Sequence, residues 1–238
     1  MRWSGRGRLG QALMPASGMP VLGAGQELPA PPQQKRSLDK RRKLLEAGRI
    51  LFGEKGYEAT SIAEIAAQAG AASGAFYIYF RSKRQLLVVL MNELIQRLAS
   101  LDLRPKGGAD ARMGLRSFLA EVFRADMQYF GVVRAWQEAA LTDAELGQMQ
   151  AAIARWTEAR ILRVFQLLQK HPNARGDRDL RTFARMMDRH FWSLLARGAR
   201  LPARDFNREI KTAADVIYHY LIRDSGREPQ KSGAGDRV

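Results

Sequence analysis

The residues with the most specific chemistry lie between Ser61 and Lys83, in the stretch SIAEIAAQAGAASGAFYIYFRSK. A phenol hydroxyl at Tyr77 and an ammonium group at Lys83 can both donate hydrogen bonds to phosphate oxygens. Five residues of the segment 73–80 are expected to face outward, and the first three are small while the last two are large: Ser73, Gly74, Ala75, Tyr77 and Ile78. Small residues allow the N-terminus of a helix, which carries a partial positive charge, to approach a groove floor closely. The pattern predicts a helix that reads the major groove of DNA.

Two short helices joined by a turn must position these side chains. Ser61 followed by Glu64 is a capping box that begins a helix over 62–69, and Gly70 provides the turn. A helix this short is unstable alone, so it must pack against the apolar stripe of the preceding helix, at 44–52. In the segment 73–80, Phe76 and Phe80 lie four residues apart and are expected to point inward. The sequence therefore predicts a helix-turn-helix unit.

Composition narrows the class of partner. The chain has 238 residues with 39 Lys and Arg against 24 Asp and Glu, a formal net charge of +15, which favours a polyanionic partner or else reflects a generally Arg-rich composition. Zero cysteines exclude disulfides and cysteine catalysis, and the three histidines lack the spacing of metal ligands, so no cofactor or metal is expected. No apolar run approaches the roughly 20 residues that span a bilayer. A reducing cytoplasm is the expected compartment.

The chain divides into four expected segments. Residues 1–36 are broken by Gly and Pro and are expected to form a disordered basic arm that follows the DNA backbone or only aids solubility; part of it would be a start-site artefact if translation began at Met14 or Met19. Residues 37–84 are the expected helix-turn-helix domain, 85–223 a larger helical domain and 224–238 a flexible tail. Helical periodicity persists from Ser37 with no alternating strand pattern, so the fold class is all-α with about nine helices.

Five short motifs stand out in this part of the chain: FGEKGY at 52–57, TSIAEIA at 60–66, the pair Ala69-Gly70, GAFYIYF at 74–80 and the pair Ser82-Lys83. Together they resemble the DNA-binding domain of the TetR family of transcriptional regulators. The resemblance implies that DNA contacts fall on Ser61, Ser73, Gly74, Ala75, Tyr77, Ile78, Tyr79 and Lys83. Ala72, Ala75 and Ile78 replace polar residues common in the family, so the domain is expected to depend on backbone amides, Tyr77, Lys83 and the arm, with Ile78 available to a thymine methyl.

The resemblance also implies a small-molecule pocket among the helices of 110–170. Most apolar residues there are expected to be ordinary core, while Met127, Trp136 and Trp156 are proposed to line the pocket because flexible Met beside aromatics suits an adaptable apolar site. Gln137 would orient a polar group, and Glu138 would do the same or lie on the helix surface.

A homodimer is the third expectation that follows from the resemblance, because the family pairs its last two helices into a four-helix bundle. The apolar stripes of those helices are core or dimer interface, and the residues assigned to the interface are Phe183, Met187, Phe191, Leu194, Ile210 and Ile217.

The expected function is a homodimeric regulator, usually a repressor in this family, that leaves a palindromic double-stranded DNA operator when an unknown, largely apolar small molecule binds. An enzyme with a helical pocket is the rival from another class, but the sequence lacks a nucleophile elbow, a phosphate loop or a paired carboxylate motif. A non-specific architectural DNA binder driven by charge is the second rival.

Overall fold

The computed structural model describes residues 19–23, 34–102, 111–125, 127–198 and 200–223, and all structural statements below refer to these residues. Within them the chain forms nine α-helices and one short 3₁₀-helix, and the one β-contact is an isolated bridge between Ala174 and Ile222. The prediction of an all-α fold with about nine helices is confirmed. No helix among the described residues is both long and apolar enough to cross a membrane.

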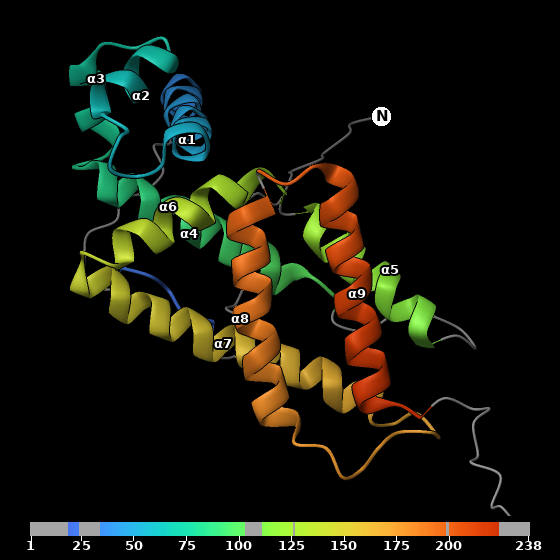
Figure 1. Ribbon diagram of the computed structural model, residues 1–238. Coiled ribbons are helices and arrows are strands. Elements are labelled where there is room, and N and C mark those ends of the chain that lie inside the picture. The colour runs from blue at the N-terminus through green and yellow to red at the C-terminus, as the bar shows by residue number, and fades with distance from the viewer. Residues whose placement is uncertain (1–18, 24–33, 103–110, 126, 199, 224–238) are drawn as a thin grey trace, which may run out of the picture.

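The first three helices form a small unit at one end of the molecule (Figure 1). They are α1 (Lys35–Lys55), α2 (Ile62–Gln68) and α3 (Ser73–Tyr79). Their apolar faces meet in a shared core, where Phe52, Ile65 and Phe76 are fully buried. The stripe on α1 that was expected to support the shorter helices is thus buried against them, which is how two seven-residue helices gain the stability that they lack alone.

The α4 helix (Lys83–Ser100) leads from this unit into the larger domain (Figure 1). That domain contains α5 (Ala111–Ala125), η1 (Met127–Tyr129), α6 (Phe130–Ala140), α7 (Ala144–Leu168), α8 (Leu180–Gly198) and α9 (Ala203–Leu221). The α6 helix packs on α1 as well as on α4, α7 and α8, so it joins the two parts of the molecule. One hydrophobic cluster accordingly runs through both parts.

The N-terminal segment departs from expectation in two places. Most of the predicted basic arm, and the tail 224–238, lie outside the described residues, but residues 19–23 pack against α4 and α1 begins at Lys35, inside the segment 1–36. Leu22 is 2% exposed, its amide donates to Asn92 Oδ1 at 3.0 Å, and Asn92 Nδ2 donates to the Leu22 carbonyl at 3.1 Å. The side-chain amide of Asn92 satisfies both the backbone N–H and the carbonyl of Leu22, so Leu22 can be buried despite the surrounding Gly and Pro. The expectation of a disordered arm is therefore wrong for residues 19–23.

Candidate DNA-contact surface and ligand cavity

The turn between α2 and α3 is built from local backbone chemistry. At the start of α2 the Ser61 hydroxyl accepts from the Glu64 amide at 3.2 Å, and the Glu64 carboxylate accepts from the Ser61 amide at 2.9 Å. Gly70 adopts a φ of 68°, a left-handed conformation that glycine tolerates best, and the Ala71 amide then donates to the Ala66 carbonyl at 2.9 Å. The predicted capping box and turn are both present. Ser61 lies on the surface, but its hydroxyl already has partners within α2.

The recognition helix α3 has one buried and one exposed face. Phe76 and the following Phe80 are fully buried, whereas Tyr77 is 58% and Ile78 75% exposed. Ser73 and Gly74 are exposed at the N-terminal end, and no atom lies within 4 Å of a Cβ built on Gly74. The N-cap Ala72 makes no side-chain hydrogen bond, so the first amides of α3 lack the usual capping oxygen. A phosphate oxygen at this end would supply the missing acceptor.

Tyr79 does not belong to the exposed face. It is 8% exposed, and its hydroxyl accepts a hydrogen bond from Ser37 Oγ of α1 at 3.0 Å. Because Tyr79 follows Phe76 by three residues, it lies on the same, buried side of α3. The expected direct contact from its side chain to DNA is replaced by a bridge that holds α3 to the first turn of α1.

The ammonium of Lys83 also has partners inside the protein. Its Nζ donates to the Tyr57 carbonyl at 2.7 Å and lies 4.3 Å from the centroid of the Tyr57 ring. The predicted phosphate contact therefore competes with a role in fixing the loop between α1 and α2. Around it, residues 35–84 carry eleven Lys and Arg against five Asp and Glu, a balance of 11 − 5 = +6. The charge of the unit remains suited to a polyanion whichever contact Lys83 makes.

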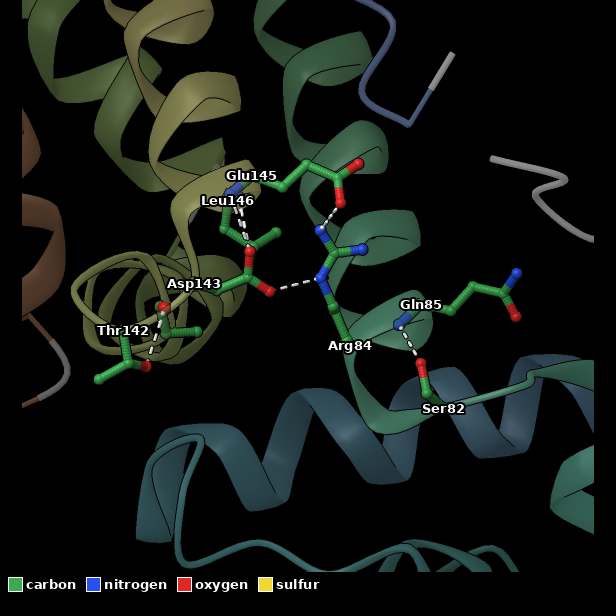
Figure 2. A network of polar contacts seen from close by, with 8 residues as sticks. Ser82, Arg84, Gln85, Thr142, Asp143, Glu145 and Leu146 are labelled. Carbon is green, nitrogen blue, oxygen red and sulfur yellow. Dashed lines mark hydrogen bonds and ion pairs between the residues drawn. The ribbon is translucent and has the colours of Figure 1, made fainter. Parts of the chain in front are cut away.

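The start of α4 is tied to the start of α7 by an ion-pair network, shown in Figure 2. Arg84 Nε donates to Asp143 Oδ2 at 2.6 Å, and its Nη2 donates to Glu145 Oε2 at 2.7 Å. Asp143 is also the N-cap of α7, because its other oxygen accepts from the Glu145 and Leu146 amides, both at 3.0 Å. The Arg84 hydrogen bond, together with these amides, lowers the pKa of the Asp143 carboxyl. The small unit of α1, α2 and α3 is called the DNA-contact unit below, and α4, the helix that follows it, is thus held at its first turn by the larger domain.

An apolar cavity of about 120 Å³ lies between the end of α4 and helices α5, α7 and α8. Its wall is mostly aliphatic and aromatic, with three polar side chains: Thr157, Arg160 and Asp188. Arg160 Nη2 donates to the Leu98 carbonyl in the last turn of α4 at 2.6 Å, and its guanidinium lies 5.0 Å from the centroid of the Trp156 ring. The cavity wall therefore includes the far end of the same helix that begins at the DNA-contact unit.

The residues expected to bind a ligand are separated by the structure. Trp156 lines the apolar cavity, and Gln137 lines a neighbouring cavity of about 450 Å³. Trp136 lines neither of these two cavities: it is fully buried and its Nε1 has no hydrogen-bond partner among the described residues. Met127 is 50% exposed in η1 and lines neither cavity. Glu138 accepts hydrogen bonds from the loop after α1 rather than facing a cavity.

Asp188 is the most buried of the three polar residues of the cavity wall, none of which was predicted from the sequence. It is 3% exposed on α8, and this burial, with the nearby charge of Glu158, raises its pKa to about 6, against the opposing effect of Thr157, Trp192 and Arg189. A charged residue inside an apolar helical stripe, here RMMDRHFW at 185–192, was the signal that could have found it.

The residues assigned to a dimer interface are mostly buried inside the single chain. Phe183, Met187, Leu194, Ile210 and Ile217 are each 8% exposed or less, and Phe191 lines the apolar cavity. Their stripes mark the inward faces of α8 and α9, a distinction that periodicity alone cannot make. The exposed apolar side chains on these helices are Met186 at 59% and Val216 at 49%, and a groove between the helices is bordered by Met187, His190, Arg208, Glu209, Thr212, Ala213 and Val216.

Residues 44–90 match the sequence model of the bacterial regulatory proteins of the tetR family. Among curated proteins, the Transposon Tn10 TetC protein of Escherichia coli is 54% identical over 44 residues, which are 18% of this chain and 22% of that protein. The Fatty acid metabolism regulator protein of Bacillus subtilis is 31% identical over 85 residues, 34% of this chain and 43% of that protein. The chain thus spans less than half the length of these curated relatives.

Solved structures extend the likeness to the larger domain. NalD of Pseudomonas aeruginosa, described as the secondary repressor of the MexAB-OprM multidrug efflux pump, shares 20% identity with a TM-score of 0.58 over 80% of this chain and 100% of that chain. A SmeT–triclosan complex shares 23% identity with a TM-score of 0.58 over 84% of this chain and 99% of that chain. At these identities the likeness shows the fold alone. The match over residues 44–90 confirms that the helix-turn-helix resembles that of the tetR family of bacterial regulatory proteins, and the solved structures show that the larger domain shares their fold.

Proposed function

We propose that the chain is a homodimeric, ligand-responsive transcriptional regulator that binds a palindromic operator and is released from it by a small molecule. The observation that carries this proposal is the exposed face of α3, where Tyr77 and Ile78 project from a unit with a net charge of +6, whose eleven Lys and Arg exceed five Asp and Glu. A large aromatic and a large aliphatic side chain that are left exposed on a basic helix-turn-helix suit a partner with both phosphates and base methyl groups.

The ligand response is supported by the course of α4. Its first residue, Lys83, contacts the loop of the DNA-contact unit, while Leu98 in its last turn lines the apolar cavity. A molecule that enters this cavity touches the helix that carries the recognition unit. A shift of α4 would change the separation of the two recognition helices of a dimer, and half-sites about 34–36 Å apart tolerate only a small change.

The dimer is proposed to form through the exposed side of α8 and α9. Met186 and Val216 are large apolar side chains exposed on adjacent helices, and a twofold axis between copies would bury both of them and their symmetry mates. This surface differs from the stripe that the sequence indicated, since that stripe is already buried within one chain.

Selection from random double-stranded DNA by the full chain, followed by fluorescence anisotropy with the selected sequence, tests the proposal. We expect a palindrome whose affinity exceeds that of random DNA by roughly 10³-fold or more at physiological salt. Sedimentation should give a dimer. Equal competition by random DNA would show instead an architectural, sequence-independent binder.

A further inference from the structure

The apolar cavity and its polar neighbour share a wall, and that wall contains a buried carboxylate. Asp188 and Trp192 of α8 line both the cavity of about 120 Å³ and the cavity of about 450 Å³. The smaller space is bounded mainly by apolar side chains, among them Phe118, Phe191 and Leu195. The larger one is bordered by polar groups, including Gln150, whose Oε1 is buried without a hydrogen-bond partner in the described part of the chain. A molecule in the smaller cavity thus meets the carboxylate at the boundary between an apolar and a polar space.

The carboxylate of Asp188 is poorly provided with partners. It is 3% exposed, and among the groups that favour its ionised form the charge of the adjacent Arg189 acts most weakly. The hydroxyl of Thr157 and the indole of Trp192 face it. However, Thr157 Oγ1 lies 3.1 Å from the Ile153 carbonyl, and Trp192 Nε1 lies 3.4 Å from Thr157 Oγ1, so both donors have competing acceptors. Burial of a charge removes it from water, and this is unfavourable unless other groups replace the lost hydrogen bonds. A bound cation would stabilise the Asp188 carboxylate in this way.

The opposite charge in the cavity wall is already in use. The Arg160 guanidinium donates to the Leu98 carbonyl at 2.6 Å and stacks near the Trp156 ring. It stabilises the end of α4, and an anionic ligand would have to displace that contact. The charged group of this wall that still lacks a full set of partners is therefore the Asp188 carboxylate, not the Arg160 guanidinium.

We propose that the cavity accepts a small apolar molecule that carries a protonated amine, with its body among the aromatic side chains and its ammonium on Asp188. This deepens the ligand response proposed above and rests on it. An engineered apolar cavity of roughly 150 Å³ in another protein binds benzene. The cavity here, at about 120 Å³, is close to that size, so a single ring with a short amine arm suits it. The ammonium would face the polar neighbouring cavity, where its remaining hydrogen bonds can be made to Gln150 or to water.

Three one-ring probes of similar size separate the possibilities without any mutation. Calorimetric titration of the full chain at pH 7 with benzylamine, benzyl alcohol and benzoate should give the highest affinity for benzylamine and the lowest for benzoate. Tightest binding of benzoate would overturn the proposal in favour of an anion held by Arg160. Equal affinities, or no binding of any probe, would overturn it as well.

Variants then assign the effect to one carboxylate. Asp188→Asn should lower the affinity for benzylamine about tenfold or more and change that for benzyl alcohol little, because a charge-assisted hydrogen bond is lost only for the amine. Glu158→Gln is the matched control: it removes a neighbouring carboxylate that borders the polar cavity alone, and should leave the preference for the amine intact. Unchanged benzylamine affinity in Asp188→Asn, with a folded protein by circular dichroism, would overturn the role of Asp188.

The same titrations distinguish this inference from the proposed function. If benzylamine binds through Asp188 but the selected DNA is held equally well with and without it, ligand release is wrong and the ligand class stands. If the selected DNA binds specifically while no probe prefers the amine, the ligand class is wrong and the DNA-binding function stands.

Discussion

Glu138 of α6 accepts a hydrogen bond from the backbone amide of Tyr57, at 2.9 Å between Oε2 and N, and so joins the larger domain to the DNA-contact unit. Its other oxygen accepts from the Glu58 amide at 3.1 Å. On the other side of the same loop, Lys83 Nζ donates to the Tyr57 carbonyl. The preceding Gly56 has a φ of 88°, and a Cβ there would lie 2.6 Å from Glu138 Oε2, so the clamp needs glycine for its space as well as its conformation. The loop between α1 and α2 is therefore fixed between α4 and α6.

Glu138→Ala should loosen this joint. It removes the acceptor of two backbone amides, and we expect a loss of about 1–3 kcal/mol in the free energy of unfolding, together with faster hydrogen exchange at the amides of residues 57 and 58. Urea unfolding and amide exchange measure both effects. Glu121→Ala, at an exposed position on α5, is the control. Similar behaviour of the two variants would show that the carboxylate contributes little to the joint.

The crossing of α1 and α6 depends on one glycine more than on the other. A Cβ on Gly131 would lie 2.2 Å from Gly53 Cα, whereas a Cβ on Gly53 would lie 3.6 Å from Gly131 Cα, an ordinary contact distance. Gly131→Ala should therefore push the helices apart and cost about 1–3 kcal/mol or more by overpacking. Gly53→Ala should be near neutral or slightly stabilising, since alanine favours the helix. Thermal unfolding of both variants provides the check, and equal losses would mean that the helices can shift freely.

Tyr77 and Tyr79 should respond differently to loss of the hydroxyl. Tyr77 is 58% exposed on α3, and we expect its hydroxyl to donate to phosphate, so Tyr77→Phe should weaken DNA binding severalfold on all sequences. The Tyr79 hydroxyl is bound to Ser37, so Tyr79→Phe should reduce stability by about 1 kcal/mol and leave the DNA contacts of α3 in place. Fluorescence anisotropy at two salt concentrations, with thermal unfolding of each variant, separates the effects. A larger loss of DNA affinity in Tyr79→Phe than in Tyr77→Phe would contradict this assignment.

The local parts of the DNA-contact unit could be predicted from the sequence because their signals are short in range. The capping box of Ser61 and Glu64, the left-handed Gly70 and the buried Phe76 each follow from residues within one or two turns. The positions of Lys83 and Tyr79 were not predictable in this way. Their partners, Tyr57 and Ser37, lie 26 and 42 residues away, and only the packing of three helices brings them together.

The larger domain shows the limit of periodicity most clearly. The stripe on α8 that includes Met187 and Leu194 was correctly helical and apolar, but the sequence does not say whether an apolar face meets its own chain or a second copy. Trp136 was assigned to a cavity on its type, yet the same size that suits ligand contact also suits a closed core, where it is fully buried. The sequence did not predict Asp188 as a cavity residue because the spacing of apolar residues gives no information about a single charged residue within the stripe.

Asp188 should make stability depend on pH in a direction opposite to that of most carboxylates. Its pKa is raised to about 6 in the folded chain, mainly by burial, so the folded state binds its proton more tightly than the unfolded state. The stabilising contribution is present below pH about 4 and is lost as the pH rises through 6. Asp188→Asn should therefore gain up to about 3 kcal/mol relative to the wild type between pH 4 and pH 8, from about two pKa units at 1.36 kcal/mol each.

Urea unfolding of both proteins at pH 4 and pH 8 measures this difference, and comparing each variant with the wild type cancels the titration of all other groups. Glu158→Gln is again the control: it removes a neighbouring carboxylate whose charge helps to raise the pKa of Asp188, so it should reproduce only part of the effect. A variant Asp188→Asn whose stability follows that of the wild type in parallel across this range would mean that Asp188 is ionised in the folded chain at little cost. In that case the protein itself would stabilise the Asp188 carboxylate, and the argument for a cationic ligand in the cavity would no longer hold.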